Sequence, residues 1–585
     1  MINAEIAQAF ERIADLMEID GGDSFRISSY RRASRTISDT NEDIAELAEQ
    51  GRLQELEGIG KGMAEKIGQF LKTGRITVLD ELEAKFPQEL SHLLGIPGMG
   101  PKKIALVYEK LKVGSLDDLK RVIASGEMAE LKGLGETSVK KIADGIAFME
   151  RSGHRTPLGV ATPIAEAFLE RVRKLPGVRR ADLCGSLRRG LDTIGDIDIV
   201  CDAADGAAVV QHFVTLPDVH RVLAAGETKG SITVASEGQR ELQIDLRVVE
   251  RDAYGAALQY FTGSKEHNVR LRERAIAKKW RLNEYGLYDA AKRIAGKTEE
   301  EIYKKLGLPC FPPELREDQG EFDGQPPDLV TLDHIRGDLH MHSVASDGRC
   351  TVEEMALAAK ARGYEYIAIC DHSKSSVIAN GLSIERILGH IDAIHAASKK
   401  MKGFEILAGC ECDILPDGSL DYPDEVLAKC DWVVASVHTA RGSMKVTATD
   451  RTLAAIANRY VSAIGHPTGR LINKRAPAEI DIAVIAHAAA ANGTFLEINA
   501  SWQRLDLKDV HARSALSAGA DLVIDTDAHH TDQLDQMRFG VITARRAGAT
   551  KGRVVNCLPL KELRKRIARK RGTASIRTRR ASDGP

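Results

Sequence analysis

The sequence Gly185-Ser186-Leu187-Arg188-Arg189-Gly190, followed by Ile194-Gly195-Asp196-Ile197-Asp198-Ile199-Val200, joins a glycine-containing turn to a short alternating run. Because side chains alternate across a strand, Asp196 and Asp198 should point together into a cleft while the isoleucines beside them point into the core. Two carboxylates suit a magnesium ion, and the backbone N–H groups of the turn, with Arg189, suit a triphosphate. The segment predicts an α/β domain with a nucleotidyl-transfer site.

A third carboxylate is expected from a neighbouring strand. The run Leu242 to Val248 alternates cleanly and puts Asp245 on its polar face. An isolated D-x-D on a strand is more often a solvated edge, but here a second carboxylate strand accompanies it. We therefore predict that Asp196, Asp198 and Asp245 form a catalytic and metal-binding triad.

The spacing of these elements carries a resemblance. Asp196 lies 10 residues after Ser186, and the sequence Tyr260-Phe261-Thr262-Gly263-Ser264 begins 15 residues after Asp245. Residues 150–320 thereby resemble the palm and thumb of the family X DNA polymerases, the group of DNA polymerase beta. The resemblance implies an α/β nucleotidyltransferase palm, an α+β thumb, and synthesis by two-metal nucleotidyl transfer with Mg²⁺ or Mn²⁺.

The resemblance also implies roles for residues around the cleft. Ser186, Arg189 and Arg155 match positions that hold the incoming triphosphate. Tyr260, Phe261 and Gly263 match the segment beside its sugar and base, and Asn268 and Arg272 match residues at the minor-groove edge. The implied nucleotide-binding set is Arg155, Gly185, Ser186, Arg189, Gly195, Tyr260, Phe261, Gly263, Asn268 and Arg272.

Two positions depart from the family pattern. Gln243 stands where better-known members have Arg near the third carboxylate, and Lys265 stands where they often have Asp over the base. These departures bear on primer-end alignment and base selectivity.

Composition bounds the class of protein. The 585 residues are 43% hydrophobic and 28% charged with a net charge of −2, which are ordinary values for a globular chain. That length suggests about four domains. Nine cysteines without a C-x-x-C pair, and no signal peptide or membrane-length apolar run, favour reduced thiols and a cytoplasmic location.

The N-terminal third repeats one pattern three times: an apolar helix end, Gly-x-Gly, then an apolar helix. The glycine pairs recur at spacings of 40 and 35 residues, and lysines follow them. Such helix-hairpin-helix units present backbone N–H groups and a helix dipole to DNA phosphates without reading sequence. The predicted DNA-binding residues are Gly58, Gly60, Lys61, Gly98, Gly100, Lys102, Gly133 and Gly135.

Lys66 follows the first hairpin at the position that in DNA polymerase beta carries the Schiff-base lysine of a deoxyribose-phosphate lyase. A lysine nucleophile requires a lowered pKa, for which Arg26, Arg31 and Lys61 are nearby in sequence. The alternative is a surface lysine on a DNA-facing helix, and both interpretations stay open.

The C-terminal third is rich in histidine, with 12 of the 17 histidines between His334 and His530. Many follow short apolar runs, as ligands at the carboxyl ends of successive strands of a (β/α) barrel would. Their order resembles the PHP domain (polymerase and histidinol phosphatase), a distorted seven-stranded barrel with a three-metal site. All nine implied ligands are present: His340, His342, Asp347, His372, Glu411, His438, His466, Asp527 and His529.

Mixed histidine and carboxylate ligands suit Mn²⁺, Zn²⁺ or Fe²⁺. The resemblance implies phosphodiester hydrolysis as a 3′→5′ exonuclease, with abasic-site cleavage or 3′-phosphate removal as further reactions. Residues 561–580 hold ten Lys or Arg against the single acid Glu562. That run is interpreted either as a solvated basic helix or as a DNA contact.

The whole arrangement resembles a multidomain, bacterial-type family X DNA polymerase, and the resemblance implies short-gap synthesis in repair. The protein would act as a monomer, away from membranes, on DNA and dNTPs. Two rivals are a PHP nuclease with an N-terminal DNA-docking module and a non-catalytic end-binding scaffold. The expected division is a lyase-like domain (1–85), helical fingers (86–150), palm (151–259), thumb (260–310), linker (311–334), PHP domain (335–570) and basic tail (571–585).

Overall fold

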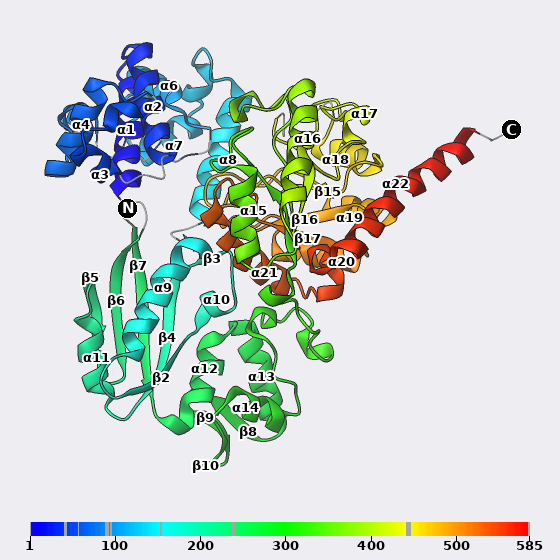
Figure 1. The fold of residues 1–585 in the computed structure, drawn as a ribbon. Coiled ribbons are helices and arrows are strands. Elements are labelled where there is room, and N and C mark those ends of the chain that lie inside the picture. The colour runs from blue at the N-terminus through cyan, green and yellow to red at the C-terminus, as the bar shows by residue number, and fades with distance from the viewer. Residues whose placement is uncertain are drawn as a thin grey trace. The chain divides into compact units, whose positions relative to one another are not determined.

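The structure is a computed structural model that describes residues 2–39, 44–56, 58–87, 90, 93, 96, 98–152, 155–236, 240–439 and 446–582. Part of the second hairpin segment (residues 94, 95 and 97) and residues 583–585 of the predicted tail lie outside these ranges. The chain divides into two compact units, one built mainly by residues 1–153 and one by residues 154–472 and 477–585. Figure 1 shows the elements of both.

The first unit is helical throughout its described residues. Gly60 and Gly100, both in extended conformation, cap the helices that follow them, and Pro101 occupies the first turn of the second, where no N–H is needed. Apolar side chains such as Phe10, Ile67 and Ile104 are fully buried between the helices. The helices are α1 (Ile2–Ile19), α2 (Ser24–Asp39), α3 (Ile44–Glu49), α4 (Lys61–Thr73), α5 (Thr77–Glu83), α6 (Pro101–Leu111), α7 (Leu116–Ala124) and α8 (Glu136–Ser152).

The second unit begins with a five-stranded sheet in the order β2-β4-β7-β6-β5. Its strands are β2 (Val178–Leu183), β4 (Asp196–Ala203), β5 (Val219–Ala225), β6 (Lys229–Ser236) and β7 (Arg240–Val249). Strand β4 pairs antiparallel with β2 and parallel with β7. Around the sheet lie β1 (Thr156–Pro157), α9 (Leu158–Arg173), α10 (Gly185–Arg188), β3 (Thr193–Ile194) and α11 (Gly206–Val214).

A smaller α+β layer follows the sheet. Ser264 caps α13 by accepting a hydrogen bond from the His267 N–H, which fixes the start of this helix. The layer consists of α12 (Tyr254–Thr262), α13 (Lys265–Ala277), β8 (Trp280–Asn283), β9 (Gly286–Asp289), β10 (Lys292–Ala295) and α14 (Glu299–Leu306).

The segment predicted as a linker is packed against this layer. Phe311 and Phe322 join the core that contains Tyr303, and Arg316 is buried in an ion pair with Glu299 at 2.5 Å. The prediction recognised the Pro- and Gly-rich composition but not the packing, because isolated aromatic residues in a non-periodic segment do not reveal their partners.

The C-terminal part is a parallel sheet of seven strands in sequential order. Its first and last strands meet through the bridge between Met341 and Ala528, which nearly closes a barrel and confirms the predicted architecture. The strands are β11 (Gly337–Met341), β12 (Tyr366–Ile369), β13 (Glu405–Asp413), β14 (Trp432–Ser436), β15 (Ala463–Ile464), β16 (Phe495–Asn499) and β17 (Leu522–Asp525).

Helices connect the barrel strands, as parallel neighbours require. They are α15 (Val352–Ala361), α16 (Ile384–Lys400), α17 (Asp424–Leu427), α18 (Ala448–Ala457), α19 (Ile482–Asn492) and α20 (Asp509–Ser517), followed by α21 (Met537–Arg546) and α22 (Leu560–Ser582). The side chains of the basic run beyond residue 572 lie outside the described part.

The five-stranded domain and the barrel share apolar packing. Three side chains from the barrel belong to the same buried cluster as the five-stranded sheet: Leu505, Phe539 and Ile472. A side chain at Gly159 of α9 would lie 2.3 Å from the Trp502 side chain, so only a glycine admits this approach. The two domains therefore form one body in this unit.

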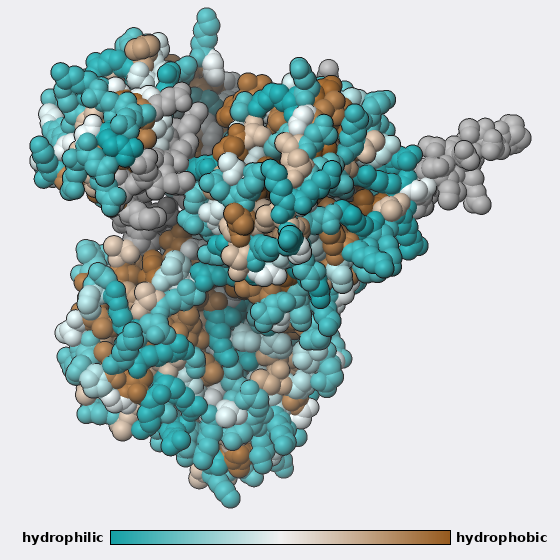
Figure 2. Space-filling view, in the orientation of Figure 1, coloured by the Kyte–Doolittle hydropathy of each residue, from teal (hydrophilic) through white to brown (hydrophobic). Residues whose placement is uncertain are grey.

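Within the described residues, no helix is long and apolar enough to cross a membrane. All nine cysteines lie among the described residues as free thiols. Figure 2 shows hydrophilic residues over most of the visible face.

Candidate active sites

The first candidate site lies where β4 and β7 run side by side. Their parallel register pairs Asp198 with Asp245 and Asp196 with Gln243. Along β4 the side chains alternate, with Ile197 buried between the two aspartates. Alternation with period 2 therefore puts the three aspartates on one face of the sheet, on two adjacent interior strands.

Asp198 is the most perturbed of the three carboxylates. Burial, and then repulsion from Asp196 and Asp245, raise the pKa of Asp198 to about 7. A side chain at Gly185 would lie 2.3 Å from the Asp198 Oδ2 atom, so the glycine allows the turn to close over this carboxylate. Crowded acidic groups of this kind suit a divalent cation.

Asp245 is held by three polar neighbours. Its Oδ1 atom accepts hydrogen bonds from Ser231 Oγ at 2.6 Å and Gln243 Nε2 at 2.8 Å, and Lys229 Nζ lies 3.0 Å from Oδ2. Burial opposes ionisation, but these hydrogen bonds and the lysine charge lower the pKa of Asp245. Gln243, noted as a departure from the family pattern, thus orients the third carboxylate. The Lys229 contact was missed, because it depends on pairing of β6 with β7.

A cavity of about 540 Å³ opens beside these carboxylates. Nine of the ten predicted nucleotide-binding residues line it, and the tenth, Gly195, lies next to Arg155. Lys265 also lines the cavity, where family members often have an acid. The lining residues are Arg155, Gly185, Ser186, Arg189, Leu191, Asp196, Asp198, Tyr260, Phe261, Gly263, Lys265, Asn268 and Arg272.

The cavity walls are fixed by hydrogen bonds. Arg189 donates from Nη1 to the carbonyl of Thr262 at 2.6 Å, which ties the turn after β2 to the end of α12. Asn268 donates to the carbonyl of Tyr260 at 2.8 Å and accepts from Gln259. Arg155 donates to the carbonyl of Thr193. These contacts hold the predicted residues in place around the cavity.

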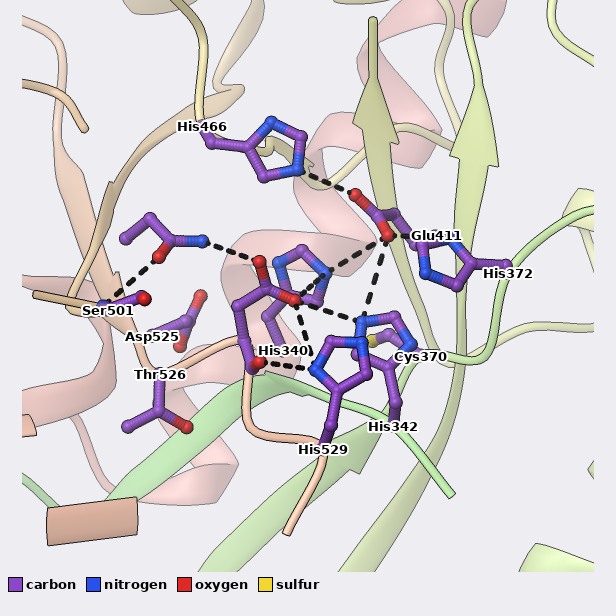
Figure 3. A network of polar contacts seen from close by, with 12 residues as sticks. His340, His342, Cys370, His372, Glu411, His466, Ser501, Asp525, Thr526 and His529 are labelled. Carbon is purple, nitrogen blue, oxygen red and sulfur yellow. Dashed lines mark hydrogen bonds and ion pairs between the residues drawn. The ribbon is translucent and has the colours of Figure 1, made fainter. Parts of the chain in front are cut away.

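The second candidate site lies at the carboxyl ends of the barrel strands (Figure 3). Eight of the nine predicted ligands form three overlapping groups there, and the ninth, His466, lies 3.0 Å from Glu411. One joins His342, Asp347, His372 and His529, another joins His340, His342 and Asp527, and the third joins His372, Glu411 and His438. Within each group the candidate ligand atoms lie within 4.8 Å of one another.

Glu411 is the centre of this arrangement. Its carboxylate oxygens face five histidines: His372 at 2.9 Å, His466 at 3.0 Å, His438 at 3.2 Å, His340 at 3.6 Å and His342 at 3.7 Å. The Oε2 atom of Glu411 is buried without a hydrogen-bond partner among the described residues. Buried polar atoms without partners are rare, so the donor set fits a group of divalent ions.

Neighbouring residues set the ligand atoms of the histidines. The His340 Nδ1 atom lies 2.6 Å from Glu497 Oε1, and because a carboxylate accepts, Nδ1 carries the hydrogen and Nε2 is left as a ligand. Asp413 holds His438 Nδ1 in the same way at 2.5 Å. Glu497 and Asp413 were missed, because histidine and acid counting does not separate ligands from the residues that orient them.

Two buried histidines of the barrel site have lowered pKa values. Burial, followed by the charges of His529 and His372, lowers the pKa of His342 to about 4. Burial, followed by Arg504, lowers the pKa of His466 to about 3. Both imidazoles are therefore neutral near pH 7, which is the form that binds metal.

The hairpin glycines of the helical unit have the geometry that the pattern predicts. Gly58, Gly98 and Gly133 have φ values of 78°, 91° and 97°, where only glycine is unstrained. At Gly60, Gly100 and Gly135 an added side chain would meet no atom within 4 Å. Each second glycine thus leaves the following helix N-terminus open to an anion.

Lys66 lies on α4, half-buried beside α2. Its Nζ atom donates to the carbonyl of Gly62 at 3.0 Å and lies 5.8 Å from the centre of the Tyr30 ring. Arg31, one of the cations expected to act on it, is paired with Glu18 at 2.6 Å and Asp15 at 3.1 Å. The charge of Arg31 is therefore already matched by acids.

Two parallel carboxylate strands beside a basic cavity, joined to a barrel with clustered histidines and acids, define a nucleotidyltransferase fused to a metal-dependent phosphoesterase. Residues 1–76 match the helix-hairpin-helix domain and residues 90–147 the SAM-like helix-hairpin-helix tandem. Residues 257–317 match the DNA polymerase beta thumb, and residues 338–501 match the PHP domain. The thumb match includes part of the predicted linker.

The chain is 37% identical over 567 residues to the DNA polymerase/3′-5′ exonuclease PolX of Bacillus subtilis, covering 96% of this chain and 99% of that protein. It is 27% identical to rat DNA polymerase lambda over 54% of this chain and 56% of that protein. A probable phosphatase of Acetivibrio thermocellus is 35% identical over 28% of this chain and 64% of its own length. The chain belongs to the PolX family of bacterial polymerase/exonucleases.

The hairpin geometry gives a charge-specific prediction. Gly60→Asp with Gly100→Asp should weaken DNA binding about tenfold or more on every sequence, because carboxylates at both helix N-termini repel phosphates. The isosteric pair Gly60→Asn with Gly100→Asn is the matched control, since Asn and Asp are equally good caps. Fluorescence anisotropy with two unrelated duplexes measures both. Equal losses in the Asp and Asn pairs would contradict an electrostatic contact at these termini.

Proposed function

We propose that this protein is a DNA-directed DNA polymerase that fills short gaps during repair and carries a 3′→5′ exonuclease in its PHP domain. The observation that carries the proposal is that one chain holds two separate sites, an acidic one in the palm and a histidine-rich one in the barrel. Asp196 and Asp198 line the cavity, and Asp245 is paired with Asp198 in the sheet. Eight of the nine candidate ligands form overlapping groups in the barrel, with His466 3.0 Å from Glu411.

In the palm, we assign Mg²⁺ or Mn²⁺ to the three aspartates. Two such ions, when bound, would activate the primer 3′-hydroxyl and neutralise the leaving pyrophosphate. Arg155, Ser186 and Arg189 would bind the triphosphate of a dNTP. The backbone at Gly263 is confined by Arg189, whose Nη1 atom lies 3.1 Å from where a Cβ would be. Asp245, oriented by Ser231 and Gln243, would face the primer end.

In the barrel, we assign three divalent ions, Mn²⁺ or Zn²⁺, to the nine ligands. These ions would activate water and absorb the charge that develops on a phosphodiester. Glu497 and Asp413 would fix the imidazoles of His340 and His438. Removal of 3′-phosphates and cleavage at abasic sites are further reactions of the same chemistry.

Binding to DNA is expected to be independent of sequence and to involve the chain as a monomer. The hairpin glycines support this, because backbone N–H groups contact phosphates and carry no base information. A nuclease with a docking module does not account for the three aspartates gathered beside a cavity. A non-catalytic scaffold accounts for neither site.

Polymerase activity should depend on Asp245. Asp245→Asn should reduce primer extension by a factor of at least ~10³, because loss of one metal ligand removes several kcal/mol of transition-state stabilisation. Exonuclease activity should be retained. Glu241→Gln, on the same strand and paired with Arg221, is the matched control. Extension on a gapped duplex with Mg²⁺ measures the effect, and near-normal extension by Asp245→Asn would refute the assignment.

The nuclease should depend on the barrel ligands. His340→Ala with His342→Ala should remove at least one ion and reduce 3′→5′ degradation below detection in Mn²⁺, while primer extension survives. The matched control is His395→Ala with His487→Ala, two histidines outside the cluster. Metal analysis and circular dichroism separate loss of ligands from unfolding. A folded double variant that still degrades 3′ ends would place the nuclease elsewhere.

We also propose that Lys66 serves as a 5′-deoxyribose-phosphate lyase nucleophile, supported by its half-buried position beside Tyr30. Borohydride should trap an adduct between the wild-type chain and a 5′-deoxyribose-phosphate end, and Lys66→Ala should lose it. Lys72→Ala, in the last turn of the same helix, controls for loss of any lysine. Equal trapping by Lys66→Ala and wild type would assign the chemistry to another amine.

A further inference from the structure

We propose that Arg546, on α21 of the PHP barrel, is a positioning residue for the polymerase reaction. It would act through Glu317 on Arg189 and so set the affinity for the incoming nucleoside triphosphate. The inference rests on the proposed polymerase function, and it assigns to the nuclease domain a part in nucleotide binding.

A single carboxylate oxygen joins the two arginines. Glu317 Oε1 accepts a hydrogen bond from Arg189 Nε at 3.0 Å and another from Arg546 Nη1 at 2.9 Å. The same Nη1 atom of Arg546 also lies 2.8 Å from the backbone carbonyl of Arg189. Arg546 therefore contacts both the main chain of the triphosphate-binding turn and the acid that holds its side chain.

The three side chains are shielded from water. Their exposed fractions are 13% for Arg189, 15% for Glu317 and 9% for Arg546. On the other side of Arg546, Asp509 accepts from Nε at 2.8 Å and lies 2.7 Å from Nη2. Two cations and two anions thus alternate in a buried row, where charge interactions are stronger than at an exposed surface.

The sharing of one oxygen has an electrostatic consequence. Because Glu317 is divided between two guanidinium groups, it neutralises only part of the Arg189 charge. The remaining positive charge is what a triphosphate in the adjoining cavity would meet. Without Arg546, Glu317 would be matched to Arg189 alone, and the attraction of Arg189 for a polyanion would fall.

The backbone packing makes the contact rigid. Gly190 follows Arg189 with a φ of 68°, and a side chain there would lie 2.1 Å from Ile542 Cγ2 on α21. Two residues further, Asp192 accepts a hydrogen bond from Arg470 of the barrel at 2.8 Å. The turn that lines the nucleotide cavity is therefore seated directly on the barrel.

Steady-state insertion of one nucleotide into a gapped duplex tests the inference on the full-length chain. Arg546→Gln should raise the KM for the dNTP about tenfold and change kcat less than about threefold, because it weakens nucleotide binding and leaves the aspartates intact. Arg546→Gln combined with Glu317→Gln should recover most of the lost affinity, since the unshared acid is then removed. A residue with only a structural role would not show this rescue.

Arg538→Gln is the matched control. It removes another arginine of α21 that reaches the palm, but its partner is Glu166 on α9, at 3.1 Å, away from the triphosphate turn. We expect wild-type KM and kcat from this variant, and wild-type 3′→5′ exonuclease rates from both. Arg546→Gln should lower the melting temperature, because Asp509 loses its buried partner, so all assays are run well below that temperature.

Three results would overturn the inference: an unchanged KM in folded Arg546→Gln, a double variant no better than the single one, or an equal effect of Arg538→Gln. A parallel loss of insertion and exonuclease activity would also overturn it, by making Arg546 structural. If the wild-type chain inserts no nucleotide, the proposed polymerase function fails, and the inference fails with it.

Discussion

The parallel pairing of β4 with β7 places the Asp198 carboxylate opposite that of Asp245, and the rest of the palm accommodates the repulsion between them. Lys229 and Ser231, on the adjacent strand β6, bind Asp245. Among the described residues Asp198 has no ion pair with a cation, and burial together with repulsion from Asp196 and Asp245 raises its pKa. The negative charge of the three aspartates is thus only partly neutralised by the protein, and divalent cations would neutralise the rest.

The barrel applies the same constraint to histidines. Parallel strands end at one face, so residues that follow different strands are brought within a few ångströms of Glu411. Burial keeps His342 and His466 neutral, while the acids around His340 raise the pKa of its imidazole well above the usual value despite burial. The cluster therefore contains both neutral imidazoles and an imidazole surrounded by acids, a mixture that suits several cations.

The two catalytic domains are less independent than their separate chemistries suggest. They share an apolar cluster through Leu505 and Phe539. The segment between them is packed against the thumb, where Arg316 forms a buried ion pair. The buried row from Asp509 to Arg189 crosses the same boundary. Interfaces packed like protein interiors are rigid. A structural change in one domain is therefore expected to shift side chains in the other.

The sequence alone determined the fold class, and it singled out the three aspartates, the nine candidate barrel ligands and the hairpin glycines. These are features of local spacing: period-2 alternation, residues at strand ends, and glycine pairs before helices. Only the tertiary structure decided that Lys229 faces Asp245, that Glu497 fixes His340, and that Arg31 is paired with Glu18. It also decided that one oxygen of Glu317 serves arginines 357 residues apart in sequence. Such pairings depend on which surfaces pack together, and packing leaves no periodic trace in the chain.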